Sequence, residues 1–138
     1  MKRTIFLINI TCYLILMLAG CGGAISNTPE RAVNDYFQSL NDNDCSKILE
    51  LHSSNFRYRP GASKEEEFKA CQEDSKRNHA ETTIQIEGVS IVENRALVNG
   101  ELAMIDQTKK ITDKIIVRLI VEDGEWKLDK ITYDDAPS

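Results

Sequence analysis

The sequence predicts one α+β domain, in which helices in the first half pack on one face of an antiparallel sheet of about four strands. Apolar residues recur with the period of a helix up to about residue 75, and alternate with the period of a strand from residue 82 onward. The two patterns do not interleave, which is typical of α+β domains and not of βαβ units. A chain of 138 residues accommodates one such domain.

Residues 1–20 predict an export signal. Lys2 and Arg3 form a positive start, and the segment from Ile5 to Leu18 is an apolar run interrupted by three small or polar residues. Such a run, ending in small residues, is typical of a secretory signal. It is shorter than the roughly 20 apolar residues that span a bilayer.

The segment Leu18-Ala19-Gly20-Cys21 resembles the lipobox of bacterial lipoproteins. The resemblance implies cleavage before Cys21, acylation of its thiol, and a flexible tether over residues 21–27 that holds the domain at a membrane. An uncleaved anchor and a plain secretory signal are the alternatives. Because Gly22 is not the Asp of an inner-membrane retention signal, the expected location is the outer membrane of a double-membraned cell. In a single-membraned cell it is the outer face of the plasma membrane.

Three helices are expected in the first half of the domain. Thr28-Pro29-Glu30 is a typical helix start, and Val33, Tyr36, Phe37 and Leu40 then form one apolar stripe. Asp44 can cap a second helix. The segment from Phe56 to Ala62 contains Pro60-Gly61 and indicates a loop. Ser63 and Glu66 form a capping box that opens a third helix, with Phe68 and Cys71 on its inner side.

Four strands are expected in the second half. The first covers residues 82–92, with a bend or bulge at Glu87-Gly88. The next two alternate through residues 96–104 and 115–121, and Asp123-Gly124 indicates a tight hairpin before a last strand that runs to about Tyr133. The predicted inward positions of the last two strands are all apolar: Val117, Leu119, Trp126 and Leu128.

Cys45 and Cys71 are the two cysteines that remain after Cys12 leaves with the signal and Cys21 is acylated. In an exported protein such a pair is expected to form a disulfide, whose loop of about 27 residues contributes roughly 3.5 kcal/mol by the chain-entropy model. Free thiols and a metal site are the alternatives. A metal is the weakest of these, because His52 and His79 have no ligand-like spacing.

The charge distribution argues against a nucleic-acid partner. The net charge is −5, and the chain after residue 20 carries 15 basic and 22 acidic side chains. A protein that binds phosphate backbones normally shows a basic stripe, which this sequence lacks. No Gly-rich phosphate loop and no Ser/His/Asp set is present either, and no cofactor is expected.

The mature domain resembles the nuclear transport factor 2-like superfamily, and within it small bacterial lipoproteins of unassigned function. The resemblance rests on Ala32-Val33-x-x-Tyr36-Phe37-x-x-Leu40, on Asp44 and Leu49, and on the hairpin from Val121 to Leu128. It covers residues 28–134 and leaves residues 135–138 as a tail. It implies a cone-like domain, with a strongly curved sheet around the helices and a pocket at the open end. The first strand pair of the longer family members is expected to be reduced or hidden in residues 56–62.

Candidate catalytic parts are present, but each has a structural interpretation that we favour. Tyr36 and Tyr58 could donate protons, His52 could act near neutral pH, and the candidate bases are Asp35, Asp106 and Asp113. Tyr36 belongs to the apolar stripe, and His52 is placed to act as a cation at a helix end. Asp106 and Asp113 flank a hairpin tip and are interpreted as surface charge. We therefore assign no catalytic residue.

Arg57-Tyr58-Arg59 is the candidate ligand site, because two guanidinium groups around a phenol could hold an anion. The favoured interpretation is a salt-bridge rim with Glu65-Glu66-Glu67. The leading functional hypothesis is a lipid-anchored binding or interaction module, with an apolar ligand in the cone or with a partner or second copy on the sheet face around Ile116, Arg118 and Ile120. The alternative is a small enzyme of the polyketide cyclase or ketosteroid isomerase type.

Overall fold

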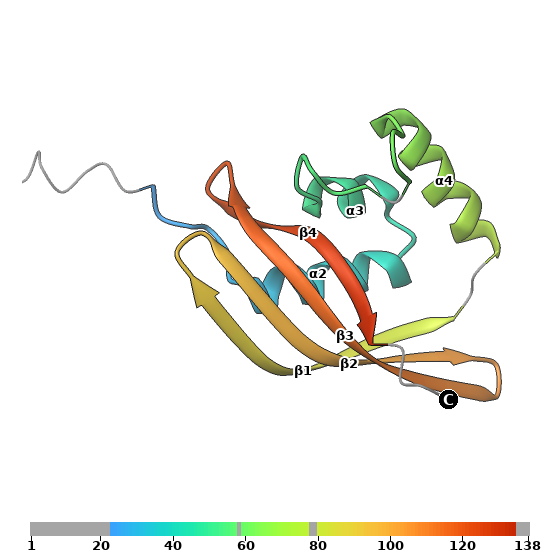
Figure 1. The fold of residues 1–138 in the computed structure, drawn as a ribbon. Coiled ribbons are helices and arrows are strands. Elements are labelled where there is room, and N and C mark those ends of the chain that lie inside the picture. The colour runs from blue at the N-terminus through green and yellow to red at the C-terminus, as the bar shows by residue number, and fades with distance from the viewer. Residues whose placement is uncertain (1–22, 58, 78–79, 135–138) are drawn as a thin grey trace, which may run out of the picture.

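The computed structural model describes residues 23–57, 59–77 and 80–134. Within these ranges, three helices precede one antiparallel sheet of four strands, as the sequence predicts (Figure 1). The helices are α2 (Pro29–Asn41), α3 (Cys45–Leu51) and α4 (Lys64–Arg77). The strands are β1 (Glu81–Val92), β2 (Arg95–Asp106), β3 (Lys109–Glu122) and β4 (Glu125–Asp134). This is the predicted α+β architecture with a curved sheet.

Helix α2 begins and ends where its local chemistry requires. The Thr28 side chain accepts a hydrogen bond from the backbone N–H of Arg31 at 3.2 Å. Pro29 lies in the first turn, where a backbone N–H would have no partner within the helix, so its missing N–H costs nothing. The helix ends before Asn43, whose positive φ of 55° breaks the helical path. One face of α2 is buried and contains Val33, Tyr36 and Phe37 of the predicted stripe.

Helices α3 and α4 have the predicted caps. Asp44 accepts from the N–H of Lys47 at 3.0 Å. At α4, the Ser63 Oγ accepts from the N–H of Glu66, and the Glu66 carboxylate accepts from the N–H of Ser63, which completes the capping box. The inner face of α4 differs from expectation, because Phe68 and Cys71 are only partly buried and the buried residue of this helix is Glu67.

The sheet is a meander in the order β1-β2-β3-β4. The first pairing shifts between Ile86 and Gly88, at the predicted bulge, and a second shift lies where Arg118 and Leu119 of β3 pair with β4. Gly100 lies across from the first bulge, and a Cβ there would come within 2.8 Å of the backbone oxygen of Gln85. A side chain at this position would therefore force β1 and β2 apart.

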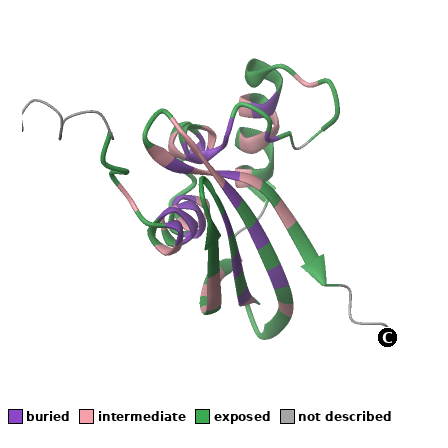
Figure 2. Ribbon diagram, turned by 60° about the vertical axis from the view of Figure 1, so that its left-hand side comes forward, coloured by how far each residue is buried: buried purple, intermediate pink, exposed green. Residues whose placement is uncertain are grey.

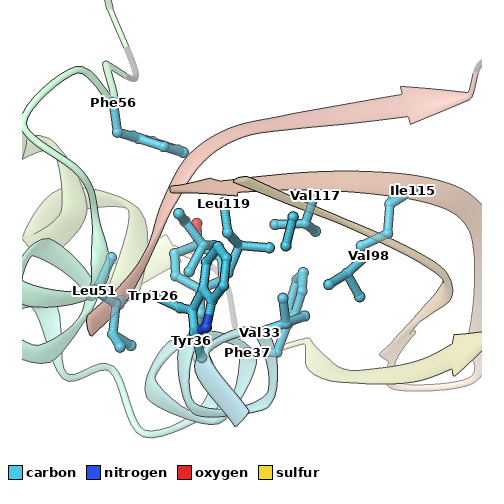
Figure 3. Packing of buried hydrophobic residues seen from close by; sticks show 14 of the residues in the cluster. Val33, Tyr36, Phe37, Leu51, Phe56, Val98, Ile115, Val117, Leu119 and Trp126 are labelled. Atoms are coloured by element: carbon cyan, nitrogen blue, oxygen red, sulfur yellow. The ribbon is translucent and has the colours of Figure 1, made fainter. Parts of the chain in front are cut away.

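The core lies between the helices and the concave face of the sheet. Figure 2 shows buried residues alternating with exposed ones along the strands, and Figure 3 shows α2 side chains meeting those of the sheet. The predicted inward residues Val117, Leu119, Trp126 and Leu128 are all buried. They pack with residues of α2 and α3 in one hydrophobic cluster.

An additional strand-like pairing is present, but not where the sequence suggested it. His52 forms a parallel bridge with Leu128 of β4, and the N–H of Ser53 donates to the oxygen of Leu128 at 2.7 Å. The described part of residues 56–62 contains no strand. The pairing therefore directly follows α3, because the chain leaves that helix in an extended conformation at His52.

The segment before α2 is only partly the free tether that we expected. The N–H of Ser26 donates to the oxygen of Gly124 at 3.0 Å. The Asn27 side chain both donates to the oxygen of Trp126 and accepts from its N–H. Ser26 and Asn27 are thus fixed to the β3–β4 hairpin, and the part of the expected tether that precedes them is correspondingly shorter.

Candidate functional site

A pocket of about 530 Å³ lies between α2, α4 and the concave face of the sheet. Its volume is in the range of small-molecule sites, about 300–1,000 Å³. Polar and apolar side chains both line it. They are Tyr36, Leu40, Asn43, Arg59, Ala70, Cys71, Asp74, Ser75, Ala80, Thr82, Met104 and Tyr133.

The α2 side of the pocket is fixed to the sheet by an asparagine. The Asn41 side chain donates to the oxygen of Thr82 at 2.7 Å and accepts from its N–H at 2.8 Å. This pairing joins the last residue of α2 to the beginning of β1. It sets the distance between Leu40, on the helix, and Met104, on the neighbouring strand, both of which line the pocket.

The α4 side of the pocket is held by a disulfide. Cys45, at the first position of α3, is bonded to Cys71 in the middle of α4, with a Cα–Cα distance of 5.9 Å. The Ser75 hydroxyl donates to the oxygen of Cys71 at 2.9 Å and lies 3.6 Å from the Cys45 sulfur. Helix α4 packs mainly against α3, so this bond and its surroundings determine where the pocket wall lies.

Tyr133 brings a titratable group to the inner face of β4. The side chain is exposed by 51%, and its partial burial, and secondly the negative charge of Asp113, raise the pKa of its phenol above the usual value of 10. The hydroxyl is therefore protonated at neutral pH and can donate a hydrogen bond to a ligand. Asp74 contributes a carboxylate and Arg59 a guanidinium to the same pocket. The pocket thus offers donors and an acceptor beside apolar surface.

Tyr133 was not predicted as a site residue, because β4 contains a bulge. Arg118 pairs with Lys130 while Leu119 pairs with Leu128, which leaves Asp129 outside the regular ladder. The extra residue reverses the alternation. Tyr133 consequently lies on the same face as Leu128, although the two are five positions apart, an odd spacing that puts residues of a regular strand on opposite faces. The signal in the sequence is a change of phase, because Ile131 and Tyr133 continue the apolar pattern one residue out of step with Trp126 and Leu128.

Asp113 is also placed differently from the surface charge that we expected. It pairs with Leu102, whose side chain is buried, and lies two residues before the buried Ile115. It therefore shares the concave face and is close enough to Tyr133 to affect its pKa. Asp106 is exposed at the end of β2, and Asp35 forms an ion pair with Arg31 at 3.7 Å on the surface of α2.

His52 is not the cation that its position at a helix end suggested. Its ring stacks on Phe56, with centroids 3.7 Å apart, and lies 5.5 Å from the ring of Tyr36. Burial lowers the pKa of His52 from 6.5 to about 4. The ring is therefore neutral at pH 7 and belongs to the core. It does not line the pocket.

The three residues of the candidate anion site have different surroundings. Arg57 donates to the backbone oxygens of Ser54 and Phe56, at 2.7 and 2.6 Å, and so stabilises its own loop. Arg59 lines the main pocket and also a second cavity of about 440 Å³ between this loop and the outer side of α4. Tyr58 lies outside the described residues.

The expected salt-bridge rim is absent from the described residues. Neither Arg57 nor Arg59 forms an ion pair there with the acidic run at residues 65–67. The physical reason is local, since Glu66 caps α4 and Glu67 is buried. Arg59 remains the candidate anion contact of this cluster.

The convex face of the sheet carries the residues that we expected to meet a partner. Leu97 and Ile116 are exposed by 45% and 42%. Arg118, the cross-strand partner of Leu97, forms an ion pair with Asp129 at 2.6 Å, and Asp129 also accepts a hydrogen bond from the Ser53 hydroxyl. Ile120 is half-buried.

Among the described residues, no group of three or more His, Cys, Asp or Glu side chains is arranged to hold a metal ion. No helix in this part of the chain is long and apolar enough to cross a membrane. The predicted acylation site, Cys21, and His79 lie outside the described residues.

Comparison by sequence finds no relatives. No protein-family model matches the chain, and no curated protein matches it either. Comparison by structure does find similar proteins. One is a nuclear transport factor 2-like protein of unknown function from Shewanella oneidensis, with 14% sequence identity and a TM-score of 0.62. It aligns with 76% of this chain and 94% of its own.

Two other solved structures show the same similarity. A nuclear transport factor 2-like protein of unknown function from Pseudomonas putida has 10% identity and a TM-score of 0.58, and covers 75% of this chain and 81% of its own. An epoxide hydrolase from M. tuberculosis, described as LEH-like, has 15% identity and a TM-score of 0.52, and covers 75% of this chain and 80% of its own. At these identities the similarity concerns the fold alone. The chain therefore has the nuclear transport factor 2-like α+β fold with a curved four-stranded sheet.

Proposed function

We propose that this chain is a lipid-anchored binding module of the cell envelope, which holds a small, partly apolar ligand between α4 and the concave face of the sheet. The pocket of about 530 Å³ is the observation that carries the proposal. Its walls on α2 and the sheet belong to elements of the core, and its α4 wall is fixed by the Cys45–Cys71 disulfide. A mixed lining with a few convergent polar groups is typical of small-molecule sites.

The binding role is tested by filling the pocket. Ala70 lines this pocket from α4 and also borders the second cavity, and a Trp there occupies space between them without replacing a buried polar group. We expect Ala70→Trp to weaken the binding of an environment-sensitive apolar dye at least tenfold. Gln72→Trp is the matched control, since Gln72 is exposed on the same helix and lines neither cavity. Equal dye binding by both variants would refute the role of this pocket.

The anchor is supported by the export signal and by the segment Leu18-Ala19-Gly20-Cys21. Two or three acyl chains at Cys21 give stable membrane attachment, whereas one chain is marginal. We expect metabolic labelling with a fatty-acid analogue to mark the wild-type chain and not Cys21→Ser. A wild-type chain that stays unlabelled, or a variant that is labelled equally, would contradict the anchor.

Tyr133 favours one alternative, a small enzyme that uses the same pocket. Its protonated hydroxyl lines the pocket and its pKa responds to the nearby carboxylate of Asp113, so a proton donor and a base share one face of the sheet. The enzyme hypothesis predicts turnover of an epoxide or an unsaturated ketone that Tyr133→Phe abolishes. Binding of the same compounds without turnover supports the binding module.

A further inference from the structure

The end of the domain that carries the N-terminal segment is formed by two hairpin turns. Ser26 and Asn27 are hydrogen-bonded to Gly124 and Trp126, at the β3–β4 turn. The β1–β2 turn lies beside it, because the N–H of Val121 donates to the oxygen of Asn94 at 2.9 Å. Figure 1 shows both turns at the same end of the sheet, next to the incoming chain.

The two most exposed large apolar side chains of the described residues lie at this end. Val92 is exposed by 69% and Ile91 by 53%, and both lie at the end of β1. Ile25 directly precedes the docked segment and is exposed by 44%. Large apolar side chains at a turn need an explanation, because turns normally carry polar residues.

The position of the proposed anchor restricts where this end can lie. Ser26 follows Cys21 by five positions. Fully extended, such a segment reaches no farther than about 17 Å. Since Ser26 is fixed to the β3–β4 turn, a lipid attached at Cys21 keeps both turns close to the membrane surface.

We propose that this end of the domain rests on the lipid surface, with Ile25, Ile91 and Val92 as its apolar contact. The inference depends on the proposed acylation at Cys21. The expected surface is a zwitterionic one. The nearby carboxylates Glu93, Glu122, Asp123 and Glu125 outnumber the cations Arg95 and Lys127, so anionic headgroups would repel this end.

The orientation has a consequence for the ligand pocket. Met104 and Tyr133, which line it, lie toward the opposite ends of β2 and β4 from the two turns. The strands therefore stand away from the membrane, and the pocket opens at a distance from it. A ligand would reach the pocket from the aqueous phase and not from the bilayer.

Site-specific fluorescence tests the contact in the full-length acylated protein. An environment-sensitive dye is attached to Val92→Cys or to Ile105→Cys, and the protein is placed in phosphatidylcholine vesicles that contain brominated acyl chains. Ile105 is the matched control, because it is an apolar residue exposed by 40% near the β2–β3 turn at the other end. We expect the bromines to quench the dye at position 92 at least twofold more than the dye at position 105. Anionic lipid in the vesicles should reduce that difference.

Other outcomes separate the failure of this inference from that of the proposed function. Protein that floats with the vesicles but shows equal quenching at both positions, or stronger quenching at position 105, overturns the orientation and leaves the anchor intact. Wild-type protein that does not float with the vesicles refutes the anchor itself.

Hydrogen exchange on the unlabelled protein provides a second measurement that needs no new cysteine. Exchange at residues 92–95 should slow on phosphatidylcholine vesicles, and exchange at residues 106–109 should not. Protection of residues 92–95 that appears only when other envelope proteins are added would show a protein partner at this end, and would overturn the lipid contact.

Discussion

His52 illustrates how the surroundings of one residue decide its charge. A histidine after a helix normally gains from being a cation, because it faces the negative end of the helix dipole. Here the ring is stacked on Phe56 and its pKa falls to about 4, so the cost of burying the charge exceeds that gain. The side chain contributes to packing as a neutral aromatic ring.

The lowered pKa of His52 predicts an acid-sensitive stability. Between pH 6.5 and about 4 the unfolded chain binds a proton at this residue and the folded chain does not. Stability therefore falls as the pH falls through this window, by about 3 kcal/mol in total for this group. Replacement by Phe removes the group, so the difference between wild type and His52→Phe in urea unfolding should change by this amount between pH 7 and pH 4. A difference that is independent of pH would show that His52 is not buried as a neutral ring.

Asp113 and Tyr133 predict a measurable coupling on the concave face. Part of the raised pKa of Tyr133 comes from the charge of Asp113. We expect Asp113→Asn to lower the pKa of Tyr133 toward 10, although burial keeps it above that value. Ultraviolet titration of the phenolate, with Tyr133→Phe to identify the signal, checks the shift. An unchanged titration in Asp113→Asn would place the two groups too far apart to act together.

At the scale of elements, α4 is the part of the fold that depends most on a single bond. This helix packs mainly against α3, and cavities lie along two of its sides. Glu67 is its one buried residue. Few apolar contacts predict a low local stability. The disulfide to Cys45 compensates for this, because it joins the middle of α4 to α3.

Removal of the disulfide should therefore affect α4 more than the sheet. The double variant Cys45→Ala, Cys71→Ala should lose roughly 3.5 kcal/mol of global stability by the chain-entropy model. We also expect faster hydrogen exchange over residues 64–77 and weaker dye binding in the pocket. The sheet, measured at residues 115–121, serves as the internal control. Uniformly faster exchange in both regions would indicate that the bond stabilises the whole domain and does not hold α4 specifically.

The bend of the sheet depends on Gly100. A Cβ at this position would lie 2.8 Å from the oxygen of Gln85, whereas nothing lies within 4 Å of a Cβ at Gly88. We expect Gly100→Ala to cost about 1–3 kcal/mol in chemical unfolding, as overpacked sites do. Gly88→Ala, on the neighbouring strand, should leave stability within about 1 kcal/mol of wild type. Equal effects of the two substitutions would contradict the close approach of β1 and β2.

The elements could be predicted from the sequence because their signals are local. The Thr28, Asp44 and Ser63 caps fix where helices begin, and alternation around Val98 and Val117 identifies the strands. The candidate site was harder to predict from the sequence. The position of Tyr133 on the concave face depends on a bulge that reverses the alternation. Arg57 donates its hydrogen bonds to backbone oxygens of its own loop. The bulge leaves a change of phase between Leu128 and Ile131 in the residue pattern, whereas the hydrogen bonds of Arg57 depend on the folded geometry of its loop, which the pattern does not encode.

At the scale of the whole molecule, the proposed anchor predicts that the convex sheet face meets a second copy of the chain. If both hairpin turns rest on the membrane, the strands stand upright and the convex face points sideways, parallel to the lipid surface. Leu97 and Ile116 on that face are exposed. Copies confined to one membrane meet at a much higher effective concentration than copies in solution.

This arrangement predicts a dimer that forms on membranes through the convex face. Energy transfer between donor- and acceptor-labelled acylated chains should exceed the value expected for random placement in a vesicle, and Leu97→Asp should return it to that value. The aspartate introduces a charge into the apolar contact, whose desolvation is unfavourable. Ile111→Asp is the matched control, because Ile111 is exposed by 42% on the same strand as Ile116 but pairs with Met104 on the concave face. Energy transfer at the random level in the wild type would show that this face does not bind a second copy.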